Sequence, residues 1–589
     1  MRLVFALAAT SVLAVAAWPA LVVAAGAAEK PVILLPGARF EGGARAHFGT
    51  TFYGRQEVNY VYARSNGPAA RMAARVTLER VPRGRLFLFL EGMDDDAPGQ
   101  CRVRVSLNGT ALLQGPSGFS QGWWSVRALP IPDGVLRPGA NEVAISCEEP
   151  EGPLGNPPWF MVARCAVAGR GYRLPDAQFA SFTVRLPRRA RPFPEPLPAG
   201  RTEPGFRFRG TKGWNWTPDQ YLEVIPVLSR LKMNFLMNCY LSLFSDGPGG
   251  AWQNRWWEPM PPARKEAYSR IFHACRQHGI TFCFAVHPQL GSPRPLVPGN
   301  DADLEQFYQH YAWAQEQGVQ WFSVSLDDVS WGEGGPAAGG LAHAWLVNVI
   351  FGRLRQRDPA AQLIFCPVPY WGDGTAPEHR AYLEALAREM HPDVYVFWTG
   401  DAVVGPRITR RAAESYKRIV KHRLFLWDNY PVNDSAPTLH LGPLSGRDPD
   451  LCAVIDGYLS NPLCPQHQAN CLPLATCADY AYNPWAYDPE RSIGQAILRF
   501  AKTDAQRRVL KELVEAYPGF LVTGGGTGTN ASRSRFDSLT PSSPAARRFV
   551  RHLEDLATRL AREFPRQFEA SRQTLAADVA WMRQRLEQP

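Results

Sequence analysis

The sequence predicts a multidomain chain with an N-terminal β-sandwich, a central (β/α)8 barrel and a C-terminal helical domain. Three observations predict this fold class. Short strand-like runs broken by glycine, proline and aspartate come first. Continuous apolar runs that alternate with amphipathic stretches follow. In the last part of the chain, apolar residues recur only at helical spacing. With 589 residues, 45% of them apolar, the chain is long enough for about three to four domains.

The first 28 residues have the pattern of a secretory signal peptide. Arg2 precedes a long apolar stretch that ends in small residues before Glu29. The alternative is a membrane anchor that stays attached. No later segment has the roughly 18 consecutive apolar residues that a spanning helix needs. We therefore predict an exported protein, secreted or periplasmic, without a stable membrane span once the signal is cleaved.

Residues 29–195 are predicted to form a β-sandwich. Runs such as "RLFLFLEGM", "CRVRVSLNG" and "WFMVARCAVAG" are short, apolar and separated by turn residues. The Asn108–Gly109 pair between two apolar runs predicts a tight hairpin. The segment around Trp123 and Trp124 resembles a jelly-roll carbohydrate-binding module. Those two rings either stack on a sugar or pack in the sandwich core.

The sequence "MDDDAPG" places Asp94, Asp95 and Asp96 next to one another in this region. Three carboxylates in one loop could hold calcium, and the alternative is a solvated loop. After the sandwich, "RLPRRARPFPEPLPAGRTEPG" is rich in proline and charge. That composition predicts an extended, semi-rigid linker.

Residues 203–484 are predicted to form the barrel. Eight apolar runs, among them "MNFLMNCY", "ITFCFAVHP" and "VQWFSVSLDD", alternate with stretches at helical spacing. Buried parallel strands explain why these runs are continuous rather than alternating. Thr217 and Pro218 have the residue types of an N-cap and a first helical position. From residue 485 to 589 apolar residues recur every three or four positions, which predicts a helical domain.

Charge and cysteine content exclude some functions. The net charge of +10 is scattered, without a basic stripe interleaved with aromatics, so we predict no nucleic-acid partner. None of the eleven cysteines forms a CxxC pair, and no cluster has metal-ligand spacing. No glycine-rich phosphate turn is present either. We therefore predict neither a metal nor a cofactor.

Active sites of such barrels lie at the carboxyl ends of the strands. The side chains expected there are rich in carboxylate, amide and aromatic groups, which bind hydroxyls and stack on sugar rings. A carbohydrate substrate is therefore predicted. The strand-end residues are Gly210 to Trp216, Asn238, His287, Asp327, Asp328, Tyr370, Trp398, Thr399, Trp427, Asn429, Asp434 and Asn461.

Asp327 and Asp328 end the run "WFSVSLDD" as two adjacent carboxylates. Most glycosidases use two carboxylates that straddle the glycosidic bond, about 5 Å or 6.5–9.5 Å apart, which adjacent residues do not obviously provide. In substrate-assisted enzymes the substrate's 2-acetamido oxygen is the nucleophile. Such an enzyme needs one carboxylate for the acetamido N–H and one as acid. Mutual repulsion would help keep one aspartate protonated.

The motif "FSVSLDDVS" resembles the catalytic strand of glycoside hydrolase family 84, the β-N-acetylglucosaminidases that include the O-GlcNAcases. The segments "FCPVPYWGDG", "VFWTGDAVV", "LFLWDNYPVNDS", "DGYLSNPL" and "LPLATCADYAYNPWAYDPERS" resemble that family in the same order. The resemblance covers about residues 205 to 490. It implies a retaining hydrolase that removes β-linked N-acetylglucosamine from a glycan or glycoconjugate.

By this resemblance Asp327 would hold the acetamido nitrogen, and Asp328 would be general acid and then base. Tyr370 would steady the acetamido oxygen. Trp427 and Asn429 would line the acetamido pocket. The sugar hydroxyls would be bound by Gly210, Asp434 and Asn461.

The first two barrel strands depart from the family pattern. The second strand lacks the lysine expected near its end, and Asn238 or Lys212 are possible substitutes. These changes put the sugar's identity in doubt more than the reaction type. Two alternatives stay open: a non-hydrolytic glycan-binding protein on the same scaffold, and an endo-acting, hyaluronidase-like hexosaminidase.

Overall fold

The structure is a computed structural model of the chain. It describes residues 31–587 except 45–54, 56, 95, 97–98, 120–123, 155–156, 173, 175–181, 245–253, 298, 435, 465–467, 525, 538 and 540–542. The predicted signal peptide, Asp95 and Trp123 lie outside the described residues. The chain forms two compact units, Met1–Gly42 with Val61–Pro175 and Gly43–Tyr60 with Asp176–Pro589.

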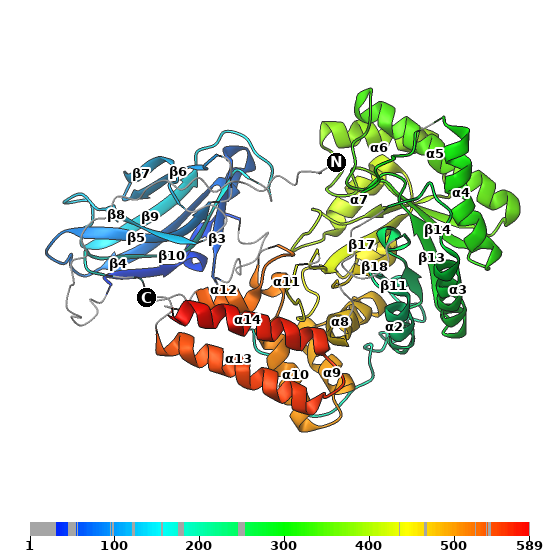
Figure 1. The fold of residues 1–589 in the computed structure, drawn as a ribbon. Coiled ribbons are helices and arrows are strands. Elements are labelled where there is room, and N and C mark those ends of the chain that lie inside the picture. The colour runs from blue at the N-terminus through cyan, green and yellow to red at the C-terminus, as the bar shows by residue number, and fades with distance from the viewer. Residues whose placement is uncertain are drawn as a thin grey trace. The chain divides into compact units, whose positions relative to one another are not determined.

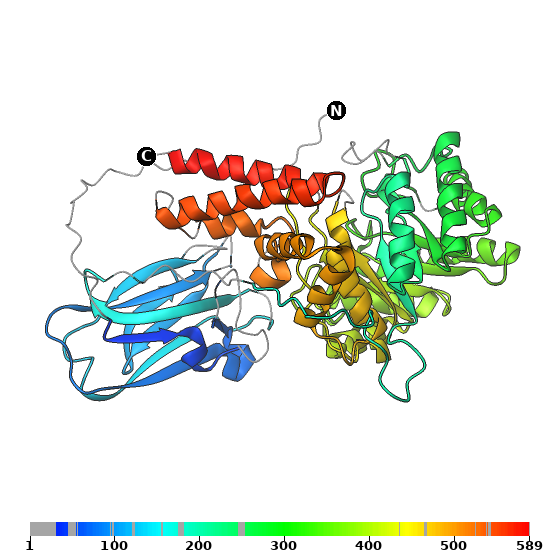
Figure 2. The ribbon, with the colours of Figure 1, turned by 90° about the horizontal axis from the view of Figure 1, so that it is seen from below.

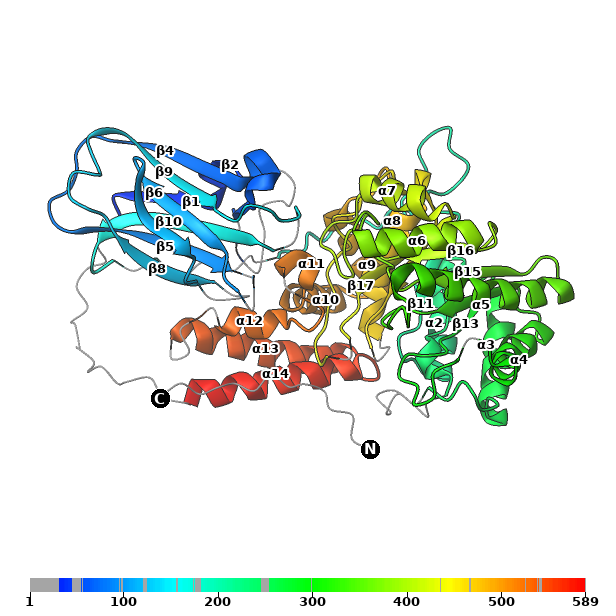
Figure 3. The same cartoon turned by 90° about the horizontal axis from the view of Figure 1, so that it is seen from above.

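The N-terminal unit contains two antiparallel sheets, which appear as two layers in Figure 3. One has the order β1-β10-β5-β8, with β3 also paired to β10, and the other the order β2-β4-β9-β6-β7. The strands are β1 (Ile33–Pro36), β2 (Glu41–Gly42), β3 (Asn59–Tyr62), β4 (Arg71–Leu78), β5 (Leu86–Asp94), β6 (Arg102–Leu107), β7 (Thr110–Pro116), β8 (Ser125–Pro130), β9 (Gly139–Cys147) and β10 (Trp159–Gly169).

The predicted hairpin is confirmed, because β6 and β7 pair across Asn108 and Gly109. Both residues have positive φ, 49° and 81°, as a tight hairpin turn of this type requires. Trp124 is buried. Asp94 is also buried and accepts hydrogen bonds from the backbone N–H of Cys101 and from the Ser117 hydroxyl. Among the described residues no group of three acidic, histidine or cysteine side chains could hold a metal ion.

The central region is a closed barrel of eight parallel strands surrounded by helices (Figure 1). The first strand pairs with the last, so no edge is left open. The elements are β11 (Phe208–Lys212), α2 (Pro218–Arg230), β12 (Phe235–Met237), α3 (Pro262–Gln277), β13 (Thr281–Val286), α4 (Asp301–Glu316), β14 (Trp321–Ser325), α5 (Gly335–Arg357), β15 (Gln362–Cys366), α6 (Pro377–Glu389), β16 (Tyr395–Trp398), α7 (Arg410–Val420), β17 (Leu424–Pro431), β18 (Ile455–Asn461) and α8 (Cys471–Tyr482).

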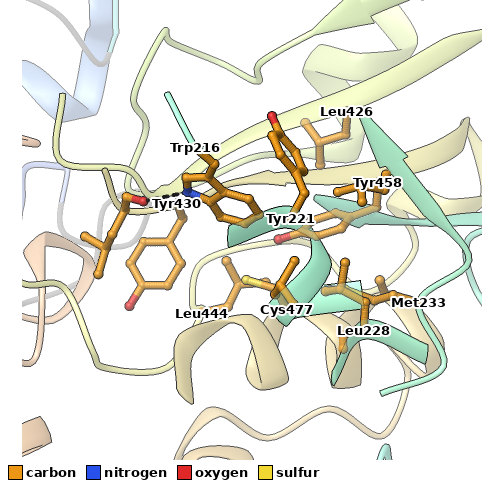
Figure 4. Close-up of a cluster of buried hydrophobic side chains, with 14 of the residues drawn as sticks. Trp216, Tyr221, Leu228, Met233, Leu426, Tyr430, Leu444, Tyr458 and Cys477 are labelled. Carbon is orange, nitrogen blue, oxygen red and sulfur yellow. Dashed lines mark hydrogen bonds between the residues drawn. The ribbon is translucent and has the colours of Figure 1, made fainter. Parts of the chain in front are cut away.

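The predicted start of α2 is confirmed. The Thr217 hydroxyl accepts a hydrogen bond from the Gln220 N–H, the Gln220 side chain returns one to the Thr217 N–H, and Pro218 follows the cap. The buried face of α2 packs with α8 against β17 and β18. Figure 4 shows this cluster, in which Trp216 and Tyr221 lie beside Tyr458 and Cys477.

Aromatic rings fill the barrel at the amino ends of its strands. Phe208 lies 4.7 Å from Trp321 and 5.4 Å from Phe425 between ring centroids, and Trp321 lies 5.3 Å from Tyr395. Phe235 packs against Phe208 at 5.6 Å. We call these five rings the aromatic floor. They close the barrel beneath its carboxyl-end rim.

One barrel crossover differs from the predicted strand–helix pattern. Between β17 and β18 the chain forms a loop, residues 432–454, whose described residues form a single 3-10 turn, at Leu451–Ala453. Several prolines and glycines in this loop disfavour a helix. A fully buried ion pair, Arg447 to Asp428 at 2.6 Å, fastens the loop to β17.

The C-terminal region is helical, as predicted, and lies against the barrel in the same compact unit. Figure 2 shows α13 and α14 side by side at its outer edge. In the described part of the chain no helix is both long and apolar enough to cross a membrane. The helices are α9 (Pro489–Phe500), α10 (Asp504–Ala516), α11 (Phe520–Thr523), α12 (Ala531–Asp537), α13 (Pro544–Glu563) and α14 (Glu569–Glu587).

The proline-rich segment before the barrel has no helix or strand, as expected of a linker. It is nevertheless bonded along its length. The backbone N–H groups of Val184, Arg191 and Glu195 donate to side chains of α10, α9 and α8. The segment is therefore bound to the neighbouring helices and does not act as a free linker.

Candidate active site

A cavity of about 320 Å³ lies at the carboxyl ends of the barrel strands. Its wall carries three carboxylates, one lysine, two asparagines and several aromatic rings. The residues that line it are Lys212, Trp214, Tyr240, Leu290, Asp327, Asp328, Cys366, Tyr370, Thr399, Val403, Val404, Trp427, Asn429, Asp434 and Asn461.

Asp327 is buried, with 5% of its surface exposed, and its two carboxylate oxygens differ. The Tyr240 hydroxyl donates a hydrogen bond to Oδ2. Oδ1 has no hydrogen-bond partner among the described residues. A buried acceptor without a partner costs free energy, so this oxygen is available for a donor on a ligand.

A buried histidine fixes the turn that carries both aspartates. The backbone N–H groups of Gln289 and Leu290 donate to His287 Nδ1, so the ring proton sits on Nε2. Nε2 then donates to the Asp327 carbonyl oxygen at 3.0 Å. Burial lowers the pKa of His287, which keeps the ring neutral and suits this hydrogen bond.

Asp328 follows with φ 58°, a left-handed backbone conformation that turns its side chain away from that of Asp327. The residue is exposed, but its carboxylate is partly buried and accepts a hydrogen bond from the Tyr370 hydroxyl at 2.7 Å. Partial burial and the neighbouring Asp327 charge raise the pKa of Asp328, whereas the Tyr370 bond opposes that rise. The two aspartates thus differ in both burial and partners.

Lys212 ends β11 inside an aromatic box. Its ammonium lies 3.4 Å from the ring centroid of Trp427, 4.9 Å from that of Trp214 and 5.0 Å from that of Tyr240. It is 1% exposed, and its Nζ has no hydrogen-bond partner among the described residues. Burial lowers the pKa of the ammonium, against the pull of nearby anionic groups that include Asp327.

Three side chains on β17 and β18 form one hydrogen-bonded wall. The Asn429 amide oxygen accepts from Trp427 Nε1 at 3.0 Å and from Asn461 Nδ2 at 2.8 Å. Asn429 Nδ2 donates to the Val403 carbonyl at 2.6 Å. Asn461 Oδ1 is buried without a partner in the described structure. The wall is therefore rigid and offers one unused acceptor.

The arrangement is suited to a small polar ligand. It combines an unpartnered ammonium with unpartnered acceptors on Asp327 and Asn461, all within the wall of one cavity. A sugar that bears hydroxyls and an amide supplies both the donors and the acceptors that these atoms lack. Burial raises the pKa of Cys366 well above its ordinary value, so this thiol is not an ionised nucleophile.

Comparison with known proteins identifies the family of the chain. The profile of the family described as beta-N-acetylglucosaminidase matches residues 210–515, just over half of the chain. The chain belongs to this family. The predicted membership of glycoside hydrolase family 84 is thereby confirmed, and the protein is a glycoside hydrolase.

One solved structure supports the fold, and a second is reported beside it. An O-GlcNAc hydrolase variant from Thermobaculum terrenum matches with a TM-score of 0.51 and 21% identity, covering 65% of this chain and 83% of that one. The structure of CpGH84B matches with a TM-score of 0.49 and 19% identity, covering 73% of this chain and 70% of that one.

In this β-N-acetylglucosaminidase most of the predicted site residues meet at the cavity. Gly210 is the exception, because it lies within β11 and does not line the cavity. A Cβ there would come within 1.7 Å of the Phe235 carbonyl oxygen, so close strand packing explains the glycine. The residues that meet are Asp327, Asp328, Tyr370, Trp427, Asn429, Asp434 and Asn461.

The structure separates the two possible substitutes for the missing lysine. The Asn238 amide is fully buried and bonds the backbone of Ala285 and Cys239, whereas Lys212 lines the cavity. Sequence reasoning missed Tyr240, the residue that holds Asp327. Its signal was an aromatic residue just beyond the second strand, in a stretch that departs from the family pattern.

Proposed function

We propose that this enzyme removes β-linked N-acetylglucosamine with retention of configuration, using the substrate's own acetamido oxygen as the nucleophile. The observation that carries the proposal is the asymmetry of Asp327. One oxygen is tied to Tyr240 and the other lies unpartnered in the cavity wall. A fixed anionic acceptor is what an acetamido N–H needs as positive charge develops on that nitrogen.

Asp328 supplies the proton transfers. Its raised pKa favours the protonated form, which donates a proton to the glycosidic oxygen while the acetamido oxygen attacks the anomeric carbon. The aglycone alcohol leaves and a bicyclic oxazoline-type intermediate remains. Asp328, now a carboxylate, takes a proton from water as the water oxygen attacks the same carbon and reopens the ring.

The substrate is expected to change the role of Tyr370. In the structure its hydroxyl proton points to Asp328. With substrate bound, the same proton turns to the acetamido oxygen. Asp328 then loses a bond that favours its ionised form, so substrate binding itself promotes protonation of the acid.

Hydrolysis of an aryl N-acetyl-β-glucosaminide, compared with the matching aryl β-glucoside, tests the proposal. We expect cleavage of the acetamido substrate alone, with the β-anomer of N-acetylglucosamine as the first product seen by NMR. Equal cleavage of both substrates, or the α-anomer as first product, would contradict it. Saturable binding of the sugar without turnover would instead support the non-hydrolytic alternative.

A Tyr370→Phe variant should shift the pH profile upward. Removing the hydroxyl removes a hydrogen bond that lowers the pKa of Asp328, so that pKa rises. The enzyme then keeps its acid protonated to higher pH, and the alkaline limb of kcat/KM moves to higher pH while the plateau falls. A profile that only loses height, with its limb unmoved, would show that this bond does not tune Asp328.

A Lys212→Met variant should lose about ten- to a hundred-fold in kcat/KM, since a hydrogen bond from a charged donor contributes about 1.5–3 kcal/mol. Methionine keeps the apolar stem in the aromatic box and removes only the ammonium. The matched control is Lys232→Met. Lys232 also lies over an aromatic ring, 4.2 Å from the Tyr482 centroid, but outside the cavity. Equal losses in the two variants would exclude a binding role for Lys212.

We also propose that the protein is exported, on the basis of the pattern in its first 28 residues. This makes a prediction for the sandwich, where Cys101 Sγ and Cys147 Sγ lie 3.4 Å apart and buried. In an oxidising compartment, exchange with a disulfide donor joins the two sulfurs as their protons leave and the donor is reduced.

Mass spectrometry of alkylated peptides checks this pair. Protein secreted into an oxidising compartment should leave Cys101 and Cys147 unalkylated until a reductant is added. Cys165, buried in the same unit, serves as the comparison. Alkylation of both cysteines in denatured, unreduced protein would contradict the prediction.

A further inference from the structure

The C-terminal helical region reaches the rim of the cavity. The loop between β17 and β18, residues 432–454, runs beside the connection between α10 and α12. The Leu441 N–H donates to the Tyr517 carbonyl at 2.9 Å. At Gly442 a Cβ would lie 2.0 Å from the Pro518 carbonyl oxygen, so the two chains touch at backbone level.

A short segment, Thr527 to Thr529, is bonded to this loop at three points. The Thr527 hydroxyl donates to Asp434 Oδ2 at 2.5 Å. His440 Nε2 donates to the Thr527 carbonyl at 2.7 Å, and the Thr438 hydroxyl donates to the Thr529 carbonyl at 3.4 Å. Burial lowers the pKa of His440 to about 4, so this ring stays neutral near neutral pH.

A buried carboxylate on α14 holds both sides of the segment. Asp578 is fully buried and accepts from the Tyr517 hydroxyl at 2.7 Å and from Asn530 Nδ2 at 2.8 Å. Its charge is balanced by Arg533 Nε at 2.6 Å. Because Asn530 directly follows the segment, the last helix fixes where Thr527 lies.

Asp434 is the carboxylate that this arrangement controls. It is exposed, has φ 46° and lines the cavity. The Thr527 hydroxyl is bonded to its Oδ2. A donor on one oxygen fixes the plane of the carboxylate. The orientation of the other oxygen is thereby fixed too, and that oxygen can accept a hydrogen bond from a sugar hydroxyl.

We propose that Thr527 is a positioning residue for Asp434, so that the C-terminal helical region completes the sugar-binding site. The inference rests on the proposed function. The hydroxyl of Thr527 acts on substrate only through Asp434. The segment therefore sets how tightly the enzyme binds sugar hydroxyls, and leaves the proton transfers of Asp328 unchanged.

Kinetics on an aryl N-acetyl-β-glucosaminide test this with Thr527→Val, Thr527→Ser, Asp434→Ala and the double variant of Thr527→Val with Asp434→Ala. Valine keeps the shape and removes the hydroxyl, and serine restores the hydroxyl. We expect Thr527→Val to lower kcat/KM about tenfold, mainly through KM. Thr527→Ser should recover most of the loss. In the Asp434→Ala background, Thr527→Val should have little further effect.

The matched control is Thr558→Val on α13, whose hydroxyl donates only to the Glu554 carbonyl of its own helix. It should leave kcat/KM unchanged. An undiminished effect of Thr527→Val in the Asp434→Ala background would overturn the inference, as would wild-type kinetics for Thr527→Val. A fall in kcat with KM and the pH profile unmoved would also overturn it.

Failure of the proposed function is distinguishable. If the wild type does not hydrolyse the glucosaminide, the proposed reaction is wrong. The role of Thr527 is then tested by measuring the binding of free N-acetylglucosamine by calorimetry. Thr527→Val must then weaken that binding by a similar factor, with rescue by Thr527→Ser. Wild-type protein that neither hydrolyses the glucosaminide nor binds the sugar overturns both.

Discussion

An Asp328→Asn variant is expected to hydrolyse alkyl N-acetyl-β-glucosaminides about 10²–10⁴-fold more slowly than the wild type, the range that general acid catalysis contributes. An alcohol leaves as a strong base unless it is protonated, and asparagine has no proton to give. A nitrophenolate leaves readily without help. Aryl substrates with acidic phenols should therefore lose much less in the bond-breaking step.

The pH profile of the same variant separates chemistry from folding. Because the pKa of Asp328 is raised, wild-type activity falls as rising pH removes the proton of the acid. That alkaline limb should vanish in Asp328→Asn. Asp393→Asn is a suitable control, since Asp393 is an exposed carboxylate paired with Arg355 at 2.6 Å. A loss that is equal for alkyl and aryl substrates would argue against an acid role for Asp328.

An Asp327→Asn variant is expected to lose about 10²–10³-fold in kcat, the cost of removing one electrostatic stabiliser of the transition state. The amide oxygen can still accept the Tyr240 hydroxyl, so the fold keeps its contact. At the position of the free carboxylate oxygen, however, the amide presents either an N–H₂ group or an uncharged oxygen. Positive charge on the acetamido nitrogen is then no longer neutralised.

Tyr240→Phe is the informative companion. It leaves the Asp327 charge in place and removes the bond that orients it, so we expect a smaller loss than for Asp327→Asn. Both variants should melt close to the wild type in a thermal unfolding scan. A fully active Asp327→Asn enzyme would contradict substrate assistance, because Asp327 is the one buried carboxylate among the described residues that line the cavity.

The fold and the position of the aspartate pair at the barrel rim were predictable because their signals are local. Buried parallel strands leave continuous apolar runs, and the carboxyl end of the fourth run places Asp327 and Asp328 at the rim without knowledge of the rest. The motifs around Trp427 and Asn429 are equally local. Each of these predictions depended on fewer than about a dozen neighbouring residues.

The remaining features depend on contacts between distant segments. Lys212 and Asn238 could not be separated by sequence, because only closure of the barrel shows which side chain faces inward. The hydroxyl of Thr527 meets Asp434 across 93 positions. The C-terminal helices showed no chemistry in their own sequence, since their contribution is a loop position fixed by Asp578.

The aromatic floor has a consequence for the order of events. The rings of Phe208, Trp321 and Phe425 fill the barrel at the amino ends of its strands, so the described cavity is closed at that end. In the proposed mechanism, the departing alcohol and the arriving water would therefore both pass the rim at the carboxyl ends of the strands. Water would reach the anomeric carbon only after the alcohol has left, and from the same side. An alcohol that diffuses out slowly would then compete with water for the proposed intermediate and re-form a glycoside instead of releasing the sugar.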